Sequence, residues 1–136
     1  MSKTILITGC SSGIGAAIAR AFHARGHKVY ATARRPESLA PLAQEGIATL
    51  PLDVNDDQSI AAAVAELEAA GDGLDILVNN AGFSQVGAVL DLAREDLRAQ
   101  YETNVIAPVA VTRAALPLLR QSASKKGRAM VVNVGS

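Results

Sequence analysis

A glycine-rich stretch near the start of the chain combines the residue types best suited to holding an anionic ligand. Residues 8–15 read Thr-Gly-Cys-Ser-Ser-Gly-Ile-Gly. They follow the apolar run 5–7 and lead into Ile14, Ile18 and Phe22, which recur at helical spacing. Glycine lets the backbone approach a ligand closely, and the first N–H groups of a helix are unpaired and favour an anion. The pattern predicts a pyrophosphate site; the alternative is an ordinary strand–helix turn.

Polar residues also follow the other predicted strands. The five strand ends carry Thr8 and Gly9, Arg34, Asp53, residues 79–82 (Asn-Asn-Ala-Gly), and Ser136. Ligands of open parallel sheets bind beyond the carboxyl ends of the strands. We therefore expect these residues to converge on one site.

Apolar runs alternate with helical patterns along the whole chain. This alternation predicts an α/β fold with a parallel sheet and helices on both faces, as one domain over residues 1–136. The expected strands are 5–7, 28–33, 47–52, 74–78 and 129–134, and the expected helices include 14–25, 37–44 and a long helix over 91–121.

Four local signals refine these elements. Pro51 suits a strand at the sheet edge. Asn55 is expected to cap the third helix, with Gln58 completing a capping box. Pro108 and Pro117 should kink or interrupt the long helix. Residues 125–128 are expected to form a polar turn before the last strand.

Several of the strand-end residues have more than one interpretation. Arg34 is either a solvated cation or a partner for the 2′-phosphate of NADP. We favour NADP over NAD as the cofactor, because the end of this strand carries no acidic residue that could bind the ribose hydroxyls. Asp53 is either a ligand contact or a helix cap. Asn79 and Asn80 are either turn residues or ties between neighbouring loops.

Two further residues could take part in a reaction. Asn104 falls on the apolar stripe of the long helix, so we expect its amide to point inward and to hold a backbone carbonyl or an ordered water. Ser136 is either a terminal serine or a hydroxyl that donates to a substrate carbonyl oxygen.

Composition excludes several classes of protein. The 13 basic and 13 acidic residues give zero formal charge, and aromatics make up 3%, so we expect no nucleic-acid partner. The single cysteine, Cys10, allows no internal disulfide and is interpreted as a loop filler. We expect no metal site and no membrane span, and we predict a soluble cytoplasmic protein.

Together these motifs resemble the short-chain dehydrogenase/reductase family. Residues 8–15 meet its Thr-Gly-x-x-x-Gly-x-Gly pattern and residues 79–82 its Asn-Asn-Ala-Gly motif, while Asp53, Asn104 and Ser136 match its adenine-contacting aspartate, active-site asparagine and catalytic serine. The resemblance implies a Rossmann-like doubly wound sheet of order 3-2-1-4-5. It also implies hydride transfer between NAD(P) and a carbonyl or alcohol substrate. The cofactor-binding residues it implies are Thr8, Gly9, Ser11, Ser12, Gly13, Ile14, Gly15, Arg34, Asp53, Val54, Asn80, Ala81 and Gly82.

The chain departs from the family at the proton donor. The family uses a tyrosine followed four residues later by lysine, but Tyr30 and Tyr101 are followed by Arg34 and Val105. We therefore expect this chain to be the N-terminal half of a longer enzyme, truncated after the fifth strand and inactive alone. The alternative is a non-catalytic nucleotide-binding or scaffold protein. The resemblance further implies a homo-oligomer, a dimer or tetramer, paired through the helix over 91–121.

Overall fold

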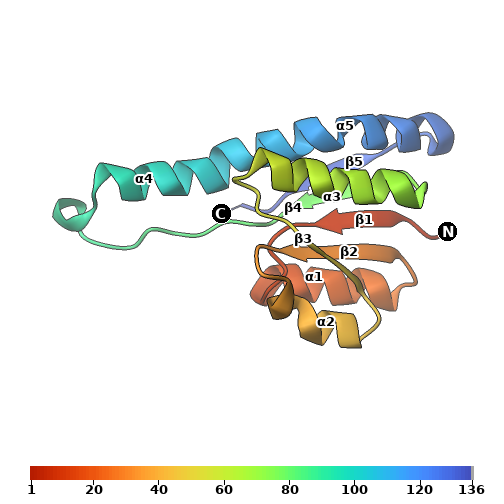
Figure 1. Cartoon of the computed structure of the whole chain (residues 1–136), viewed down its shortest axis with the longest axis horizontal. Coiled ribbons are helices and arrows are strands. Elements are labelled where there is room, and N and C mark those ends of the chain that lie inside the picture. The colour runs from red at the N-terminus through yellow and green to blue at the C-terminus, as the bar shows by residue number, and fades with distance from the viewer. Residues whose placement is uncertain (136) are drawn as a thin grey trace.

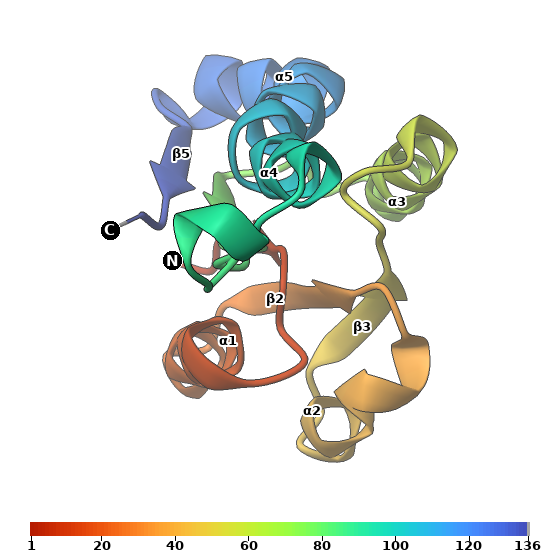
Figure 2. The ribbon, with the colours of Figure 1, turned by 90° about the vertical axis from the view of Figure 1, so that its left-hand side faces the viewer.

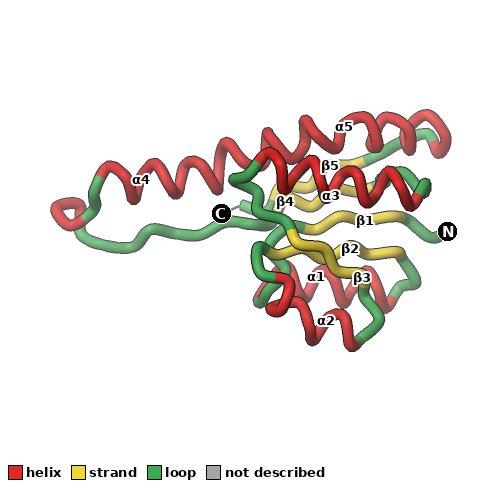
Figure 3. The backbone as a smooth tube through the Cα atoms, viewed as in Figure 1, coloured by secondary structure: helices red, strands yellow, loops and turns green. Residues whose placement is uncertain are grey.

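Five parallel strands form one twisted sheet in the computed structural model, which describes residues 1–135 (Figure 1, Figure 3). The strand order is β3-β2-β1-β4-β5, as the resemblance implied. Pro51 lies in β3 at one edge of the sheet, which confirms its predicted position. The strands are β1 Thr4–Ile7, β2 Lys28–Ala33, β3 Ala48–Pro51, β4 Ile76–Asn79 and β5 Met130–Asn133.

Helices cover both faces of the sheet, with α1 and α2 on one side and α3 and α5 on the other (Figure 2). Alternation along β1 explains this division, because Ile5 and Ile7 pack in the cluster of α1 and α2 while Leu6 packs with α3 and α5. The helices are α1 Gly13–Ala24, the 3₁₀ turn η1 Pro36–Leu39, α2 Ala40–Gln44, α3 Asp57–Ala70, the 3₁₀ turn η2 Val89–Asp91, α4 Arg94–Tyr101, the π-helical turn η3 Glu102–Ile106 and α5 Ala107–Lys126.

The predicted cap of α3 was wrong by one residue. Asp56, rather than Asn55, is the N-cap, and its Oδ1 accepts a hydrogen bond of 2.9 Å from the backbone N–H of Gln58. The side chain of Asn55 instead donates to Thr103 Oγ1, 2.9 Å away. A carboxylate at the helix start also suits the helix dipole better than an amide does.

The long helix predicted over residues 91–121 has different bounds, and the interruption predicted at Pro108 is confirmed. The chain is helical from Arg94 to Lys126, but the π-helical turn η3 separates α4 from α5. Pro108 follows this turn; it has no N–H to donate to the Asn104 carbonyl and its ring would crowd that carbonyl in a regular α-helix. By contrast, α5 continues without interruption through Pro117.

The predicted polar turn over residues 125–128 starts too early. Lys125 and Lys126 form the last turn of α5, where cations favour the helix dipole, and Gly127 ends the helix with a positive φ of 89°. Strand β5 lies at the other edge of the sheet, and its apolar side chains are exposed, as expected for an edge. None of the helices within residues 1–135 has both the length and the apolar character needed to cross a membrane.

Candidate functional site

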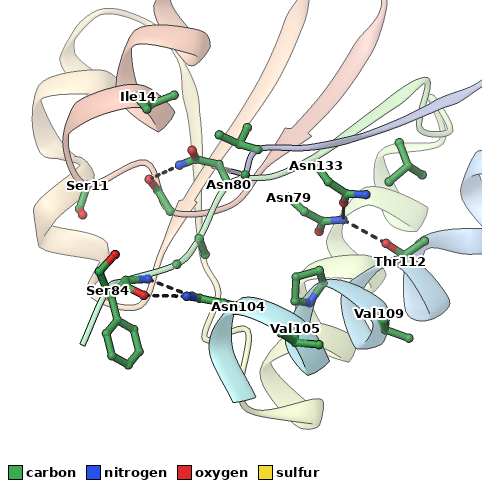
Figure 4. Close-up of a pocket in the computed structure, with 18 of the residues that line it drawn as sticks. Ser11, Ile14, Asn79, Asn80, Ser84, Asn104, Val105, Val109, Thr112 and Asn133 are labelled. Carbon is green, nitrogen blue, oxygen red and sulfur yellow. Dashed lines mark hydrogen bonds between the residues drawn. The ribbon is translucent and has the colours of Figure 1, made fainter. Parts of the chain in front are cut away.

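An open cleft of about 1180 Å³ lies at the carboxyl ends of β1, β4 and β5 (Figure 4). Its walls come from the glycine-rich loop, from the segment after β4, from η3 and the first turns of α5, and from the end of β5. The cleft brings together eight of the predicted site residues, Gly9, Ser11, Ser12, Ile14, Asn80, Ala81, Gly82 and Asn104. The predicted convergence of the strand ends is therefore confirmed for Gly9 and residues 79–82, whereas Arg34 and Asp53 do not line the cleft.

Close backbone contact explains two of the glycines. Gly9 has a φ of 70°, and a Cβ built there would lie 2.7 Å from Ala81 Cα. A Cβ on Gly15 would overlap the carbonyl oxygen of Gly9 and lie 2.6 Å from Asn80 Nδ2. Neither glycine position has room for a side chain, because the loop packs against the segment that follows β4.

The start of α1 is open to an anion. Ser12 is its N-cap but forms no side-chain capping bond within residues 1–135, and the first turn holds no acidic residue. Ser11 to Ile14 are exposed, and Ile14 is 61% exposed although it belongs to the predicted apolar face. The buried face of α1 is formed instead by small residues, Gly15, Ala16 and Ala19. The helix therefore lies close to the sheet and leaves its first N–H groups free for a phosphate.

Thr8 and Asn80 clamp the end of β1 to the end of β4. Thr8 Oγ1 accepts hydrogen bonds from the backbone N–H groups of Asn80 (3.0 Å) and Ala81 (2.9 Å), and Asn80 Nδ2 donates to the Gly9 carbonyl over 3.0 Å. The interpretation of Asn80 as a tie between loops is confirmed. Thr8 acts from beneath the loop, because it is buried.

Asn104 does not point into the core as predicted. It is exposed, because η3 and α4 project past the end of the sheet, where no strand lies opposite them (Figure 1). Its Nδ2 donates to the Phe83 carbonyl (2.6 Å), and its Oδ1 accepts from the Phe83 N–H (3.0 Å). Of the two partners expected for this amide, the structure shows the backbone carbonyl. The pairing fixes the loop after β4 against η3.

The remaining predicted residues lie outside the cleft lining. Arg34 follows β2, is exposed, and forms no salt bridge within the described part of the chain. Asp53 does not cap α3; its Oδ1 accepts from the Asn55 N–H at 3.0 Å. Val54 is buried. Gly13 starts α1, and Ser136 lies outside the described residues.

The loop cysteine is a filler, as predicted. Cys10 is 1% exposed, and its thiol donates to the Ile7 carbonyl over 3.4 Å. Burial raises the pKa of Cys10 to about 11, which keeps the thiol protonated. Within residues 1–135 the structure gathers no cluster of three metal-ligating side chains.

The residues of the cleft that the sequence did not indicate include Thr112, Asn133 and Phe83. Thr112 and Asn133 bond to Asn79, and Phe83 lines the cleft beside Asn104. The signal for Asn133 was present, since it is a polar residue inside an apolar strand. Thr112 and Phe83 carry no such signal, because their partners depend on how α5 and η3 pack.

Known proteins share this fold and these motifs. A family model described as short chain dehydrogenase matches residues 3–136. A short-chain dehydrogenase/reductase of Pestalotiopsis microspora is 46% identical over 121 residues, which cover 88% of this chain and 44% of the relative. An oxidoreductase of Botryotinia fuckeliana is 40% identical, over 91% of this chain and 47% of the relative. The chain thus spans about half the length of the curated relatives it matches.

Solved structures of a short-chain dehydrogenase and of a carbonyl reductase have a fold similar to that of this chain. A short-chain dehydrogenase from Streptomyces avermitilis superposes with a TM-score of 0.88 at 40% identity, covering 99% of this chain and 49% of that one. An NADPH-bound carbonyl reductase from chicken fatty liver gives a TM-score of 0.90 at 31% identity, over 99% of this chain and 60% of that one. With the glycine loop and the Asn79–Gly82 segment packed as described, these matches establish that the chain belongs to the short-chain dehydrogenase family.

Proposed function

We propose that residues 1–136 form the dinucleotide-binding domain of an NADP-dependent oxidoreductase that transfers a hydride between the cofactor and a carbonyl or secondary alcohol. The observation that carries the proposal is the open N-terminus of α1 beside a glycine loop with no room for a side chain. This cradle fits a pyrophosphate, because a Cβ at Gly9 or Gly15 would fill the space that the backbone needs. The NADPH-bound carbonyl reductase of similar structure supports the choice of substrate class.

Arg34 supports NADP over NAD. Its guanidinium carries a charge at the end of β2, is exposed, and forms no salt bridge to an acidic residue within residues 1–135. A 2′-phosphate would supply the missing anion through charge-assisted bonds. Asp53 and Val54, at the end of β3, are proposed to lie along the adenosine half of the cofactor.

The cofactor preference is tested by a charge reversal in the intact source protein. We expect Arg34→Asp to weaken NADPH binding by about 10–100-fold, the value of one or two lost charge-assisted bonds, and to change NADH binding much less. Arg25→Asp, at the far end of α1, is the matched control for net charge. Isothermal titration calorimetry with both cofactors measures the effect. Equal loss for NADPH and NADH in Arg34→Asp would contradict the 2′-phosphate assignment.

The reaction would take place in the part of the cleft that Asn104 lines. The nicotinamide supplies or accepts the hydride when the cofactor is bound. Asn104 holds the loop after β4 through both atoms of its amide, and Ser136 is proposed to donate a hydrogen bond to the substrate oxygen. Neither tyrosine is followed four residues later by a lysine, so we propose that the proton donor is supplied by residues other than these 136.

A comparison of the 136-residue chain with the intact source protein tests this assignment of the proton donor. The 136-residue chain should bind NADPH but show no NADPH oxidation with a panel of aldehydes and ketones, whereas the intact source protein should turn over. The absorbance of NADPH measures its oxidation by each of the two proteins. Turnover by the 136-residue chain would contradict the assignment of the proton donor.

We further propose that the intact protein is a homo-oligomer. Exposed apolar side chains on α4 and η3 that do not line the cleft support this: Leu97, Tyr101 and Ile106. Light scattering after gel filtration measures the mass, and a monomer at micromolar concentration would contradict the proposal. The cytoplasmic location stays a prediction.

A further inference from the structure

Asn79 joins three elements through one amide group. It is the last residue of β4, and its Nδ2 donates to Thr112 Oγ1 on α5 (3.1 Å) and to Asn133 Oδ1 on β5 (3.0 Å) (Figure 4). Asn79 and Asn133 are direct partners in the sheet register, and the Val134 N–H donates to the Asn79 carbonyl over 3.0 Å. The ends of β4 and β5 and one turn of α5 are therefore held to one another by both backbone and side chains.

Asn79 is a buried polar residue whose amide is only partly hydrogen-bonded. The residue is 5% exposed, and its Oδ1 has no hydrogen-bond partner among residues 1–135. A buried amide with one unpaired atom is a poor choice for stability alone, since an apolar residue of similar shape would avoid the desolvation cost. The two bonds that Asn79 does make thus fix positions at a cost in stability, which is typical of functional sites.

The elements that Asn79 joins are next in the sequence to the expected reaction residues. Asn133 precedes Ser136 by three residues in the sequence, and Thr112 on α5 follows Asn104 on η3 by eight residues. No other side chain described in residues 1–135 bonds β4 to both β5 and α5. Movement of α5 relative to β5 would change the spacing between Asn104 and the end of β5.

We propose that Asn79, Thr112 and Asn133 form a positioning cluster that sets the distance between η3, which carries Asn104, and the end of β5. The inference rests on the proposed oxidoreductase function. None of the three residues is a catalytic residue; they act through the elements they join. Misplacement of reacting groups by about 1 Å can lower a rate by about 100-fold without loss of substrate binding. The cluster should therefore control the rate of hydride transfer rather than the affinity for NADPH.

The test uses Thr112 in the intact source protein. Thr112→Val keeps the branched shape and removes the hydroxyl that accepts from Asn79, and Thr112→Ser keeps the hydroxyl. We expect Thr112→Val to lower kcat about tenfold, with KM and the NADPH Kd within threefold of wild type, and Thr112→Ser to recover most of the rate. Ser122→Ala removes a buried hydroxyl that has no hydrogen-bond partner among residues 1–135, near the far end of α5, and is the control for changing a buried polar group elsewhere on that helix.

Each outcome decides the proposal. An unchanged kcat in Thr112→Val overturns it, even if the melting temperature falls, and so does an equal loss of kcat in Ser122→Ala. If the wild-type protein shows no oxidation of NADPH that depends on a carbonyl compound, the proposed function fails instead. Amide hydrogen exchange then decides the cluster: faster exchange over 104–112 and 130–135 in Thr112→Val supports it, and unchanged exchange overturns it.

Discussion

Replacing Gly15 by alanine tests the idea that close backbone packing, rather than flexibility, shapes the dinucleotide loop. Gly15 is buried in the first turn of α1, and its φ is not in the left-handed region. Alanine would therefore be tolerated by the local backbone. The obstacle is space, because the new Cβ would overlap the Gly9 carbonyl oxygen and lie 2.9 Å from the Gly9 carbonyl carbon and 2.6 Å from Asn80 Nδ2.

The size of the effect follows from these distances. Ordinary contact begins at 3.4 Å, so relief at Asn80 alone needs a shift of 0.8 Å (3.4 minus 2.6), and the Gly9 peptide must move further. That movement breaks the bond from Asn80 Nδ2 to the Gly9 carbonyl. The lost bond costs about 1 kcal/mol and the overpacking about 1–3 kcal/mol. We expect Gly15→Ala to lower the melting temperature by roughly 5–15 °C and to weaken NADPH binding by more than about 100-fold.

The matched control is Gly26→Ala, beyond the other end of the same helix. Gly26 has a φ of 81° and open space around its Cβ position, so alanine there should cost about 1–2 kcal/mol of strain but leave the loop in place. Differential scanning calorimetry and titration calorimetry on the intact protein measure both effects. The reasoning is refuted if Gly15→Ala binds NADPH within threefold of wild type, or if Gly26→Ala loses as much affinity.

Three further predictions concern single side chains. Cys10 should be labelled by a thiol reagent at pH 8 more than about 100-fold faster in urea than in the folded protein, because burial raises its pKa to about 11; equal rates would contradict this. Burial alone would raise the pKa of Asp75, but hydrogen bonds from Lys126 and the Thr4 N–H lower this pKa overall. The carboxylate therefore stabilises the fold at a pH above its unfolded pKa of about 3.9. This stabilisation is lost as the pH falls through the lower pKa of the folded state. Urea unfolding should therefore show Asp75→Asn less stable than wild type at pH 7 with the gap closing below about pH 4, and a constant gap would count against the ion pair. Asp56→Ala should lower the free energy of unfolding by about 1 kcal/mol through loss of the α3 cap, and Asn55→Ala should lower it less. Chemical denaturation measures both, and the reverse order would indicate that Asn55 is the cap.

The sequence predicted most of the fold because its signals were local. Alternation of apolar runs and helical patterns located all five strands within one or two residues, and Pro51 correctly indicated an edge. The strand order came from the family resemblance rather than from the periodicity. The glycine loop and Asn80 were also predictable, because their partners lie at neighbouring strand ends.

What the sequence missed depended on how distant elements meet. The apolar stripe through Asn104 predicted a buried amide, but the stripe extends past the sheet, where no strand is present to bury it. The interruption at Pro108 was predicted, but the one expected at Pro117, in the middle of α5, does not occur. Thr112 has an ordinary place on a helix; only the packing of α5 on β4 gives it a partner.

Two adjacent asparagines at the end of β4 divide the cleft into two parts. Neighbouring residues of an extended chain point to opposite faces, so Asn80 reaches the α1 side and Asn79 reaches the α5 side. Asn80 bonds to the loop proposed to hold the cofactor phosphates. Asn79 bonds to α5, which follows the turn that carries Asn104, and to β5, which precedes Ser136 in the sequence. Cofactor affinity and reaction rate should therefore respond to different substitutions. Loss at Gly15 should appear mainly in Kd, and loss at Thr112 mainly in kcat.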